Sequence, residues 1–353
     1  MAIRNSLDNV DRRFVLSSFK RLLEADSPAG YYPDVHACLA QILGELGYAM
    51  EVDNKATAYV RIPGERSDGV RCIAAHLDTV GLVVRGFNDN GTLRVRGIGT
   101  ISYSSIEGET CRIHCRDGRV VEGQVICDRH SVHVFADSRD IARNETNMSV
   151  SIISDVRCPD DARALGVGAG ALVAIDPHPQ FFDNGYIVSR HIDDKAAVAV
   201  LLDVLRILKE TGSVPAHDTL FAFPMCEEIG HGGSFVPEEV REYVALDIAL
   251  IGPDYEADEH HVGVITSDSH GPYDWELTNR LIRLAAENCD RGKWSQQVTY
   301  RYTTDASHAY RASHDLKASA FGMACMNTHG RERSHIDALV QTERLALAYL
   351  LEG

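Results

Sequence analysis

The hydrophobic pattern of this 353-residue chain changes twice, and these changes constrain its fold more than any other feature. Before about residue 75 and after Ile187, apolar residues recur at helical spacing or in short continuous runs, which predicts helices alternating with buried strands. From Val80 to about Pro179, Asn90-Gly91 and Asp117-Gly118 each separate short β-type runs, as in antiparallel hairpins. The pattern predicts an α/β fold: a mainly parallel sheet flanked by helices, with an inserted, smaller β domain.

The block of β character sets the predicted domain boundaries. Residues 1–79 together with 180–353 should form the α/β domain, and residues 80–179 a β-barrel-like insertion. Polar residues that directly follow buried strands are the candidate site residues, because ligands in such sheets collect at the carboxyl ends of strands. The expected helices are 12–23, 35–46 and 195–209, and the expected buried strands are 71–75, 219–223 and 248–251.

Composition excludes several classes of function. A net charge of -16 argues against nucleic-acid binding, which needs Lys and Arg to neutralise phosphates. No apolar run approaches the roughly 20 residues of a membrane span, and the first residues lack the apolar core of a signal peptide, so we expect a cytoplasmic protein. The nine cysteines show no CxxC spacing, which indicates reduced, mostly buried thiols.

Four dispersed clusters carry imidazole and carboxylate groups, the ligands of divalent metal sites. Each has a structural alternative: polar strand ends, acids that favour a helix N-terminus, or a surface turn. His329 is a weaker candidate than the histidine before the last helix, and no serine-nucleophile elbow or phosphate-binding loop is present. The clusters are His76-Leu77-Asp78, Asp193-Asp194, Glu227-Glu228 and Ser334-His335-Ile336-Asp337.

Together these segments resemble the dinuclear-zinc aminopeptidases of the tetrahedral aminopeptidase and glutamyl aminopeptidase family, over almost the whole chain. A sister family of dinuclear-zinc carboxypeptidases and deacylases also carries His-x-Asp-Thr-Val and Glu-Glu, but usually inserts its extra domain later. Here the β block lies between His76 and Asp193, which favours the aminopeptidases. The landmarks are the segments 75–81, 189–195, 226–230 and 304–306, and His335 before the last helix.

The resemblance implies two divalent metal ions per subunit, zinc first, with cobalt or manganese as alternatives. Asp193 would bridge the two ions and Glu227 would be the general base. Asp78, two residues after His76, would hold the ring of that histidine. Asp247 is the alternative to Asp254, although it precedes the expected strand 248–251. The implied metal ligands are His76, Asp193, Glu228, Asp254 and His335.

The activity implied by the resemblance is removal of N-terminal residues from short peptides by a hydroxide held between two zinc ions. Two alternatives stay open: a deacylase or amidase acting on N-blocked or amidated dipeptide-like substrates, and a non-catalytic binding module on the same scaffold. Relatives assemble through the β domain into dodecamers, which implies a homo-oligomer whose β domain serves oligomerisation and substrate access. Segments 164–166, 181–194, 269–274 and 328–339 are similar to a subgroup associated with dipeptide osmolyte synthesis.

Overall fold

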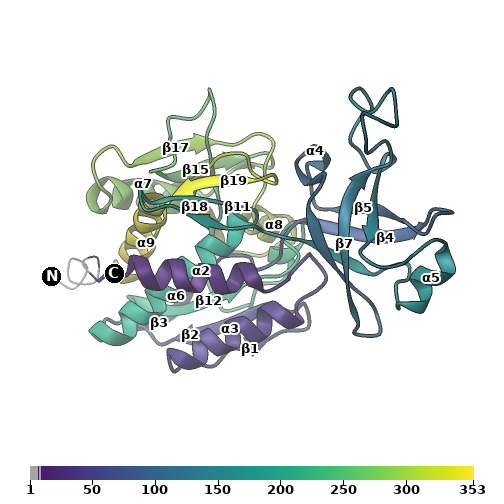
Figure 1. Ribbon diagram of the computed structural model, residues 1–353. Coiled ribbons are helices and arrows are strands. Elements are labelled where there is room, and N and C mark those ends of the chain that lie inside the picture. Colours follow the sequence, from purple (N-terminus) through teal and green to yellow (C-terminus); the bar gives the residue numbers. More distant parts are fainter. Residues whose placement is uncertain (1–6, 8) are drawn as a thin grey trace.

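The computed structural model describes residue 7 and residues 9–353, and Figure 1 shows a large α/β body with a smaller barrel at one side. The chain is α/β, as predicted. The helices of the body are α2 (Arg12–Glu24), α3 (Pro33–Glu45), α6 (Ile192–Thr211), α7 (Trp275–Asn288), α8 (Asp305–Arg311) and α9 (Ile336–Leu351). The described helices contain none that is long and apolar enough to cross a membrane.

The main sheet is mixed, with parallel pairs at its centre and antiparallel pairs toward its sides. Its order is β1 (Glu51–Val52), β2 (Ala58–Ile62), β12 (His217–Phe223), β3 (Arg66–Ala74), β13 (Val240–Leu246), β18 (Lys317–Cys325), β15 (Val262–Asp268) and β16 (Gly271–Pro272); β14 (Ala249–Leu250) pairs with β18, and β17 (Trp294–Val298) with β15. β3 runs parallel to β12 and β13, and β13 runs parallel to β18. β2 and β15 run antiparallel to their neighbours β12 and β18, so the sheet is less uniformly parallel than the pattern predicted.

Both faces of the central strands are buried, which explains their continuous apolar runs. Successive side chains point to opposite faces of a strand. Ile73 of β3 therefore packs in the large core formed with α6 and α9, whereas Cys72 and Ala74 pack in a second core that includes residues of α8. α6 lies at the centre of the large core, and its first fourteen residues, 192–205, are all buried.

The barrel is closed by six strands in the order β4-β5-β8-β7-β6-β9. The two expected turns are present, because Gly91 joins β4 to β5 and Gly118 joins β6 to β7, each with the positive φ that favours glycine. The barrel also carries α4 (Tyr103–Ile106) and α5 (Pro159–Ala164). Its strands are β4 (Gly81–Phe87), β5 (Leu93–Ile98), β6 (Thr110–His114), β7 (Val120–Cys127), β8 (Met148–Ile152) and β9 (Leu172–Ile175).

A buried carboxylate joins the barrel to the body. Asp26, which follows α2, accepts hydrogen bonds from the Nε and Nη2 atoms of Arg112, both at 2.6 Å. His114 Nε2 lies 2.7 Å from the same carboxylate. Both basic residues belong to β6, so this cluster fixes the barrel against the body. The nine cysteines are all free, as predicted.

Candidate metal centre

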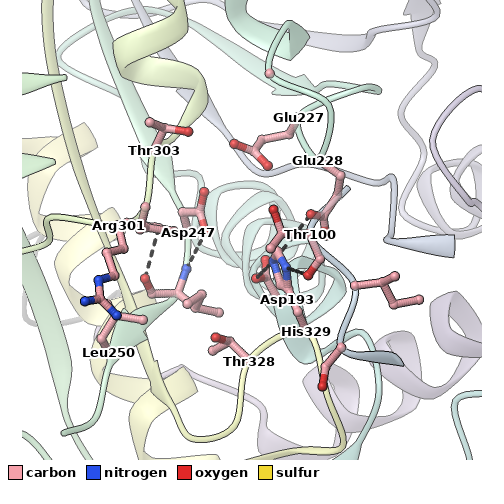
Figure 2. Close-up of a pocket in the computed structure, with 15 residues that line it drawn as sticks. Thr100, Asp193, Glu227, Glu228, Asp247, Leu250, Arg301, Thr303, Thr328 and His329 are labelled. Carbon is pink, nitrogen blue, oxygen red and sulfur yellow. Dashed lines mark hydrogen bonds and ion pairs between the residues drawn. The ribbon is translucent and has the colours of Figure 1, made fainter. Parts of the chain in front are cut away.

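Five of the predicted or alternative site residues, Asp193 among them, meet at one edge of the main sheet. His76 follows β3, Glu227 and Glu228 follow β12, and Asp247 directly follows β13. Because these three strands are parallel, their carboxyl ends meet at the same edge. Asp193 reaches this edge from the start of α6. A cavity of about 600 Å³ lies there, and Figure 2 shows its acidic side chains with Arg301 on the far wall.

Asp193 lies between two imidazole rings. Its Oδ1 atom is 3.1 Å from His76 Nε2, and its Oδ2 atom is 3.5 Å from His329 Nε2. His329 Nε2 is also 3.4 Å from Glu228 Oε2, while His76 Nε2 is 3.8 Å from Glu227 Oε2. A carboxylate with one oxygen toward each of two histidines has the arrangement of a bridging ligand. His76, Glu227 and Asp247 each also offer one donor atom within 4.8 Å of the others.

The cavity holds more carboxylates than cationic groups can balance. Burial raises the pKa of Glu227 and Asp247 well above the ordinary range, and it raises the pKa of Glu228 to about 7. Although burial opposes its charge, Glu228 and Asp193 raise the pKa of His329 to about 10. Buried like charges of this kind are stabilised by cations. The imidazole and carboxylate donor set therefore fits divalent ions of the zinc type.

Asp78 supports the site through its main chain and its side chain. His76 Nδ1 lies 3.0 Å from the Asp78 carbonyl oxygen, to which it donates, so Nε2 is the nitrogen that faces Asp193. The Asp78 carboxylate instead accepts the backbone N–H groups of Glu227 and Glu228, at 3.0 and 3.1 Å. Asp78 thereby positions both the histidine and the glutamate pair.

The structure brings His329, the weaker histidine candidate of the sequence, to the cluster. Its Nδ1 atom donates to the carbonyl oxygen of Thr100 in the barrel, at 2.8 Å, which leaves Nε2 directed at Asp193 and Glu228. A signal for it was present in the sequence, because His329 follows the carboxyl end of the apolar strand β18.

His335 and Asp254 do not join the cluster. His335 ends β19 (Glu332–His335), which pairs with β11 (Tyr186–Ser189) in a separate sheet completed by β10 (Gln180–Phe181). Both of its ring nitrogens are engaged: Nε2 donates to the Asn184 carbonyl, and Nδ1 accepts the Asp337 backbone N–H. Asp254 is exposed and accepts a hydrogen bond from the Tyr300 hydroxyl. The expected strand 248–251 is only the two-residue β14, so Asp254 lies beyond the sheet edge at which Asp247 stands.

Comparison with known proteins identifies the family. The M42 glutamyl aminopeptidase family model matches residues 57–345. The chain belongs to the M42 glutamyl aminopeptidase family. A putative aminopeptidase of Bacillus subtilis (strain 168), YhfE, is 32% identical over 96% of this chain and 97% of its own. Family membership supports aminopeptidase activity, and M42 peptidases are metal-dependent hydrolases.

Two solved structures share the fold. The TET1 peptidase of Pyrococcus horikoshii, described as assembling into a tetrahedron or a large octahedral shell, has a TM-score of 0.83 at 20% identity and covers 96% of this chain and 100% of its own. PhTET1-12s, described as a dodecamer, has a TM-score of 0.81 at 20% identity, with 96% and 99% covered. Both likenesses extend over the α/β body and the barrel.

Proposed function

We propose that this M42 protein is an aminopeptidase that uses two divalent metal ions, zinc in the first place, to remove the N-terminal residue of short peptides. The observation that carries the proposal is the pair of imidazoles on either side of Asp193, with Glu227 beside one of them. His76 and Asp247 would hold one ion, Glu228 and His329 the other, and Asp193 would bridge them. His329 and Asp247 replace His335 and Asp254 in this ligand set because they line the cavity.

The bound ions supply Lewis acidity and lower the pKa of water. The protein supplies the base and the geometry. Glu227 is held by the hydrogen bond from its backbone N–H to Asp78, and burial raises the pKa of its carboxyl group. A carboxylate with a raised pKa can accept a proton from the attacking water and later deliver it to the leaving nitrogen.

The acidic cavity favours a substrate with a free amino terminus, because its carboxylates attract an ammonium group. An N-blocked substrate lacks this charge, so the deacylase or amidase alternative predicts the opposite preference. The similarity to the osmolyte-associated subgroup keeps amidated or acylated dipeptides among the substrates to be tested. We further propose a homo-oligomer, possibly a dodecamer, assembled through the barrel, because both solved relatives are described as assemblies.

The test is turnover of short peptides, each offered with a free and an N-acetylated amino terminus, by protein reconstituted with zinc or cobalt. Free-amine substrates should be cleaved and blocked ones should not. The Glu227→Gln variant should retain its metal and lose turnover by roughly a hundredfold or more. Glu256→Gln, at an exposed loop position, is the matched control and should keep wild-type turnover. Cleavage of blocked substrates alone, or full activity of Glu227→Gln, would contradict the proposal.

A further inference from the structure

A second cavity opens beside the acidic one and has the opposite character. Its volume is about 430 Å³, and Gly230 and Thr303 form part of the wall of both cavities. Its titratable lining side chains are His270, His308 and Arg311, and no carboxylate of the described residues lines it. A substrate bound in the acidic cavity would therefore lie next to a basic cavity.

His308 is buried but has a nitrogen available to this cavity. The residue is only 6% exposed, and its Nδ1 atom lies 3.3 Å from Asp305 Oδ1. Asp305 also accepts the Gly233 backbone N–H, which holds the carboxylate in place behind the ring. The Nε2 atom faces Gly230, where an added Cβ would stand 3.9 Å away, and it has no hydrogen-bond partner among residues 9–353. His308 Nε2 can therefore serve as a hydrogen-bond donor to a ligand in this cavity.

Arg311 supplies a permanent positive charge at the same place. It lies on α8 three residues after His308, so the two side chains share one side of the helix. Its Nη1 atom is 2.8 Å from His270 Nε2, and within the described part of the chain it forms no ion pair with a carboxylate. The nearby Asp268 is engaged by the Tyr273 hydroxyl and by the His270 backbone N–H. The guanidinium is therefore free to bind an anion.

The position of Glu227 indicates which part of a substrate would enter the basic cavity. One oxygen of Glu227, one of Asp305 and one ring nitrogen of His308 lie within 4.8 Å of one another. Under the proposed function Glu227 delivers a proton to the leaving nitrogen, so the residue that carries this nitrogen lies beside His308. In a dipeptide the carboxylate carbon is only about 2.5 Å from that nitrogen, because both are bonded to the same Cα. In a longer peptide a neutral amide stands there instead.

We infer that the basic cavity binds the α-carboxylate of the leaving residue through Arg311 and His308, and that the enzyme therefore favours dipeptides over longer peptides. The inference rests on the proposed function. The Arg311 guanidinium binds a carboxylate through charge-assisted hydrogen bonds, which are stronger than those to a neutral amide, and His308 Nε2 offers a further donor.

The test compares kcat and KM for substrates that share one N-terminal residue X: X-Ala, X-Ala-amide, X-Ala-Ala and X-Asp-amide. Wild-type protein should show a kcat/KM for X-Ala about ten- to a hundredfold above that for X-Ala-amide, mainly through KM. Arg311→Met should bring this ratio close to one, and Arg311→Lys should restore part of it. Arg301→Met removes an arginine from the far wall of the acidic cavity and should leave the ratio unchanged.

Several outcomes would overturn the inference. They are equal kcat/KM for X-Ala and X-Ala-amide, an unchanged ratio in Arg311→Met, and an equal loss of the ratio in Arg301→Met. A preference for X-Asp-amide over X-Ala would assign the cavity to a side-chain carboxylate and so overturn the preference for dipeptides. Cleavage of none of the four substrates would contradict the proposed function, whereas cleavage without preference would contradict this inference alone.

Discussion

Replacing Asp26 by Asn should weaken the attachment of the barrel to the α/β body. The carboxylate is 7% exposed and takes part in three charge-assisted contacts, two from Arg112 and one from His114. Removing one partner of a buried ion pair costs about 3–5 kcal/mol. Because the Arg112 side chain is 27% exposed and also pairs with Asp176, we expect the lower end, about 3 kcal/mol in the free energy of unfolding.

The contribution of Asp26 should also depend on pH. Although burial opposes its charge, hydrogen bonds from Arg112 and His114 lower the pKa of Asp26. A lowered folded-state pKa gives stability that is present above the unfolded value of about 3.9 and is lost as the pH falls below it. The difference between wild type and Asp26→Asn should therefore be complete at neutral pH and shrink below about pH 4.

The assay is urea unfolding at fixed protein and metal concentration, because both affect apparent stability. Asp26→Asn, Arg112→Met and the double variant form a cycle that should give a coupling energy of at least about 1.5 kcal/mol. Asp117→Asn is the matched control, because its pair with Arg119 is on the barrel surface and should contribute little to the free energy of unfolding. An additive cycle, or an equal loss in Asp117→Asn, would refute the role assigned to the buried pair.

Five further variants, two of which are controls, and one treatment test the site. His329→Ala should lower the metal bound per subunit, measured by elemental analysis, whereas His335→Ala should not; the reverse result would restore the ligand expected from the resemblance. Asp247→Asn should likewise lose metal while Asp254→Asn keeps it. Asp78→Asn should keep most metal and lose about ten- to a hundredfold in kcat, because it holds the glutamate pair; unchanged kcat would exclude this role. A chelator should lower the thermal unfolding temperature and added zinc should restore it; no shift on metal removal would show that no cation offsets the repulsion between the buried carboxylates.

Local patterns in the sequence predicted the local elements well. The apolar spacing of 195–209 lies within α6, and the two glycine turns join the barrel strands as expected. Helical periodicity and hairpin turns depend on residues close in sequence, so a single chain reports them directly. Strand pairing in the sheet depends on residues far apart in sequence. No local pattern therefore indicated that β2 and β15 run antiparallel to their neighbours.

Asp254 and His335, the two predicted ligands that lie away from the cavity, were chosen for different physical reasons. For Asp254 the reason is a strand that its composition concealed. Arg241 and Glu242 interrupt the apolar character of β13, so the run at 248–251 was taken for the strand instead. Because β13 ends at Leu246, Asp247 lies at the carboxyl edge of the sheet, just as His76 does after β3. The choice between His329 and His335 needed the tertiary structure, because His329 follows β18 and His335 ends β19, and only β18 belongs to the main sheet.

The hydrogen bond from His329 to Thr100 limits which sequence changes the loop at 99–102 can accept. The acceptor is a main-chain carbonyl, so the Thr100 side chain is free to change without loss of the bond. An inserted or deleted residue would move the carbonyl and release the ring. Gly99 is more restricted, because its φ is +72° and an added Cβ would stand 3.1 Å from the Glu228 carbonyl oxygen. Related proteins that keep this contact to His329 should therefore keep the length of the loop and the glycine at position 99, whereas the other side chains of the loop can vary.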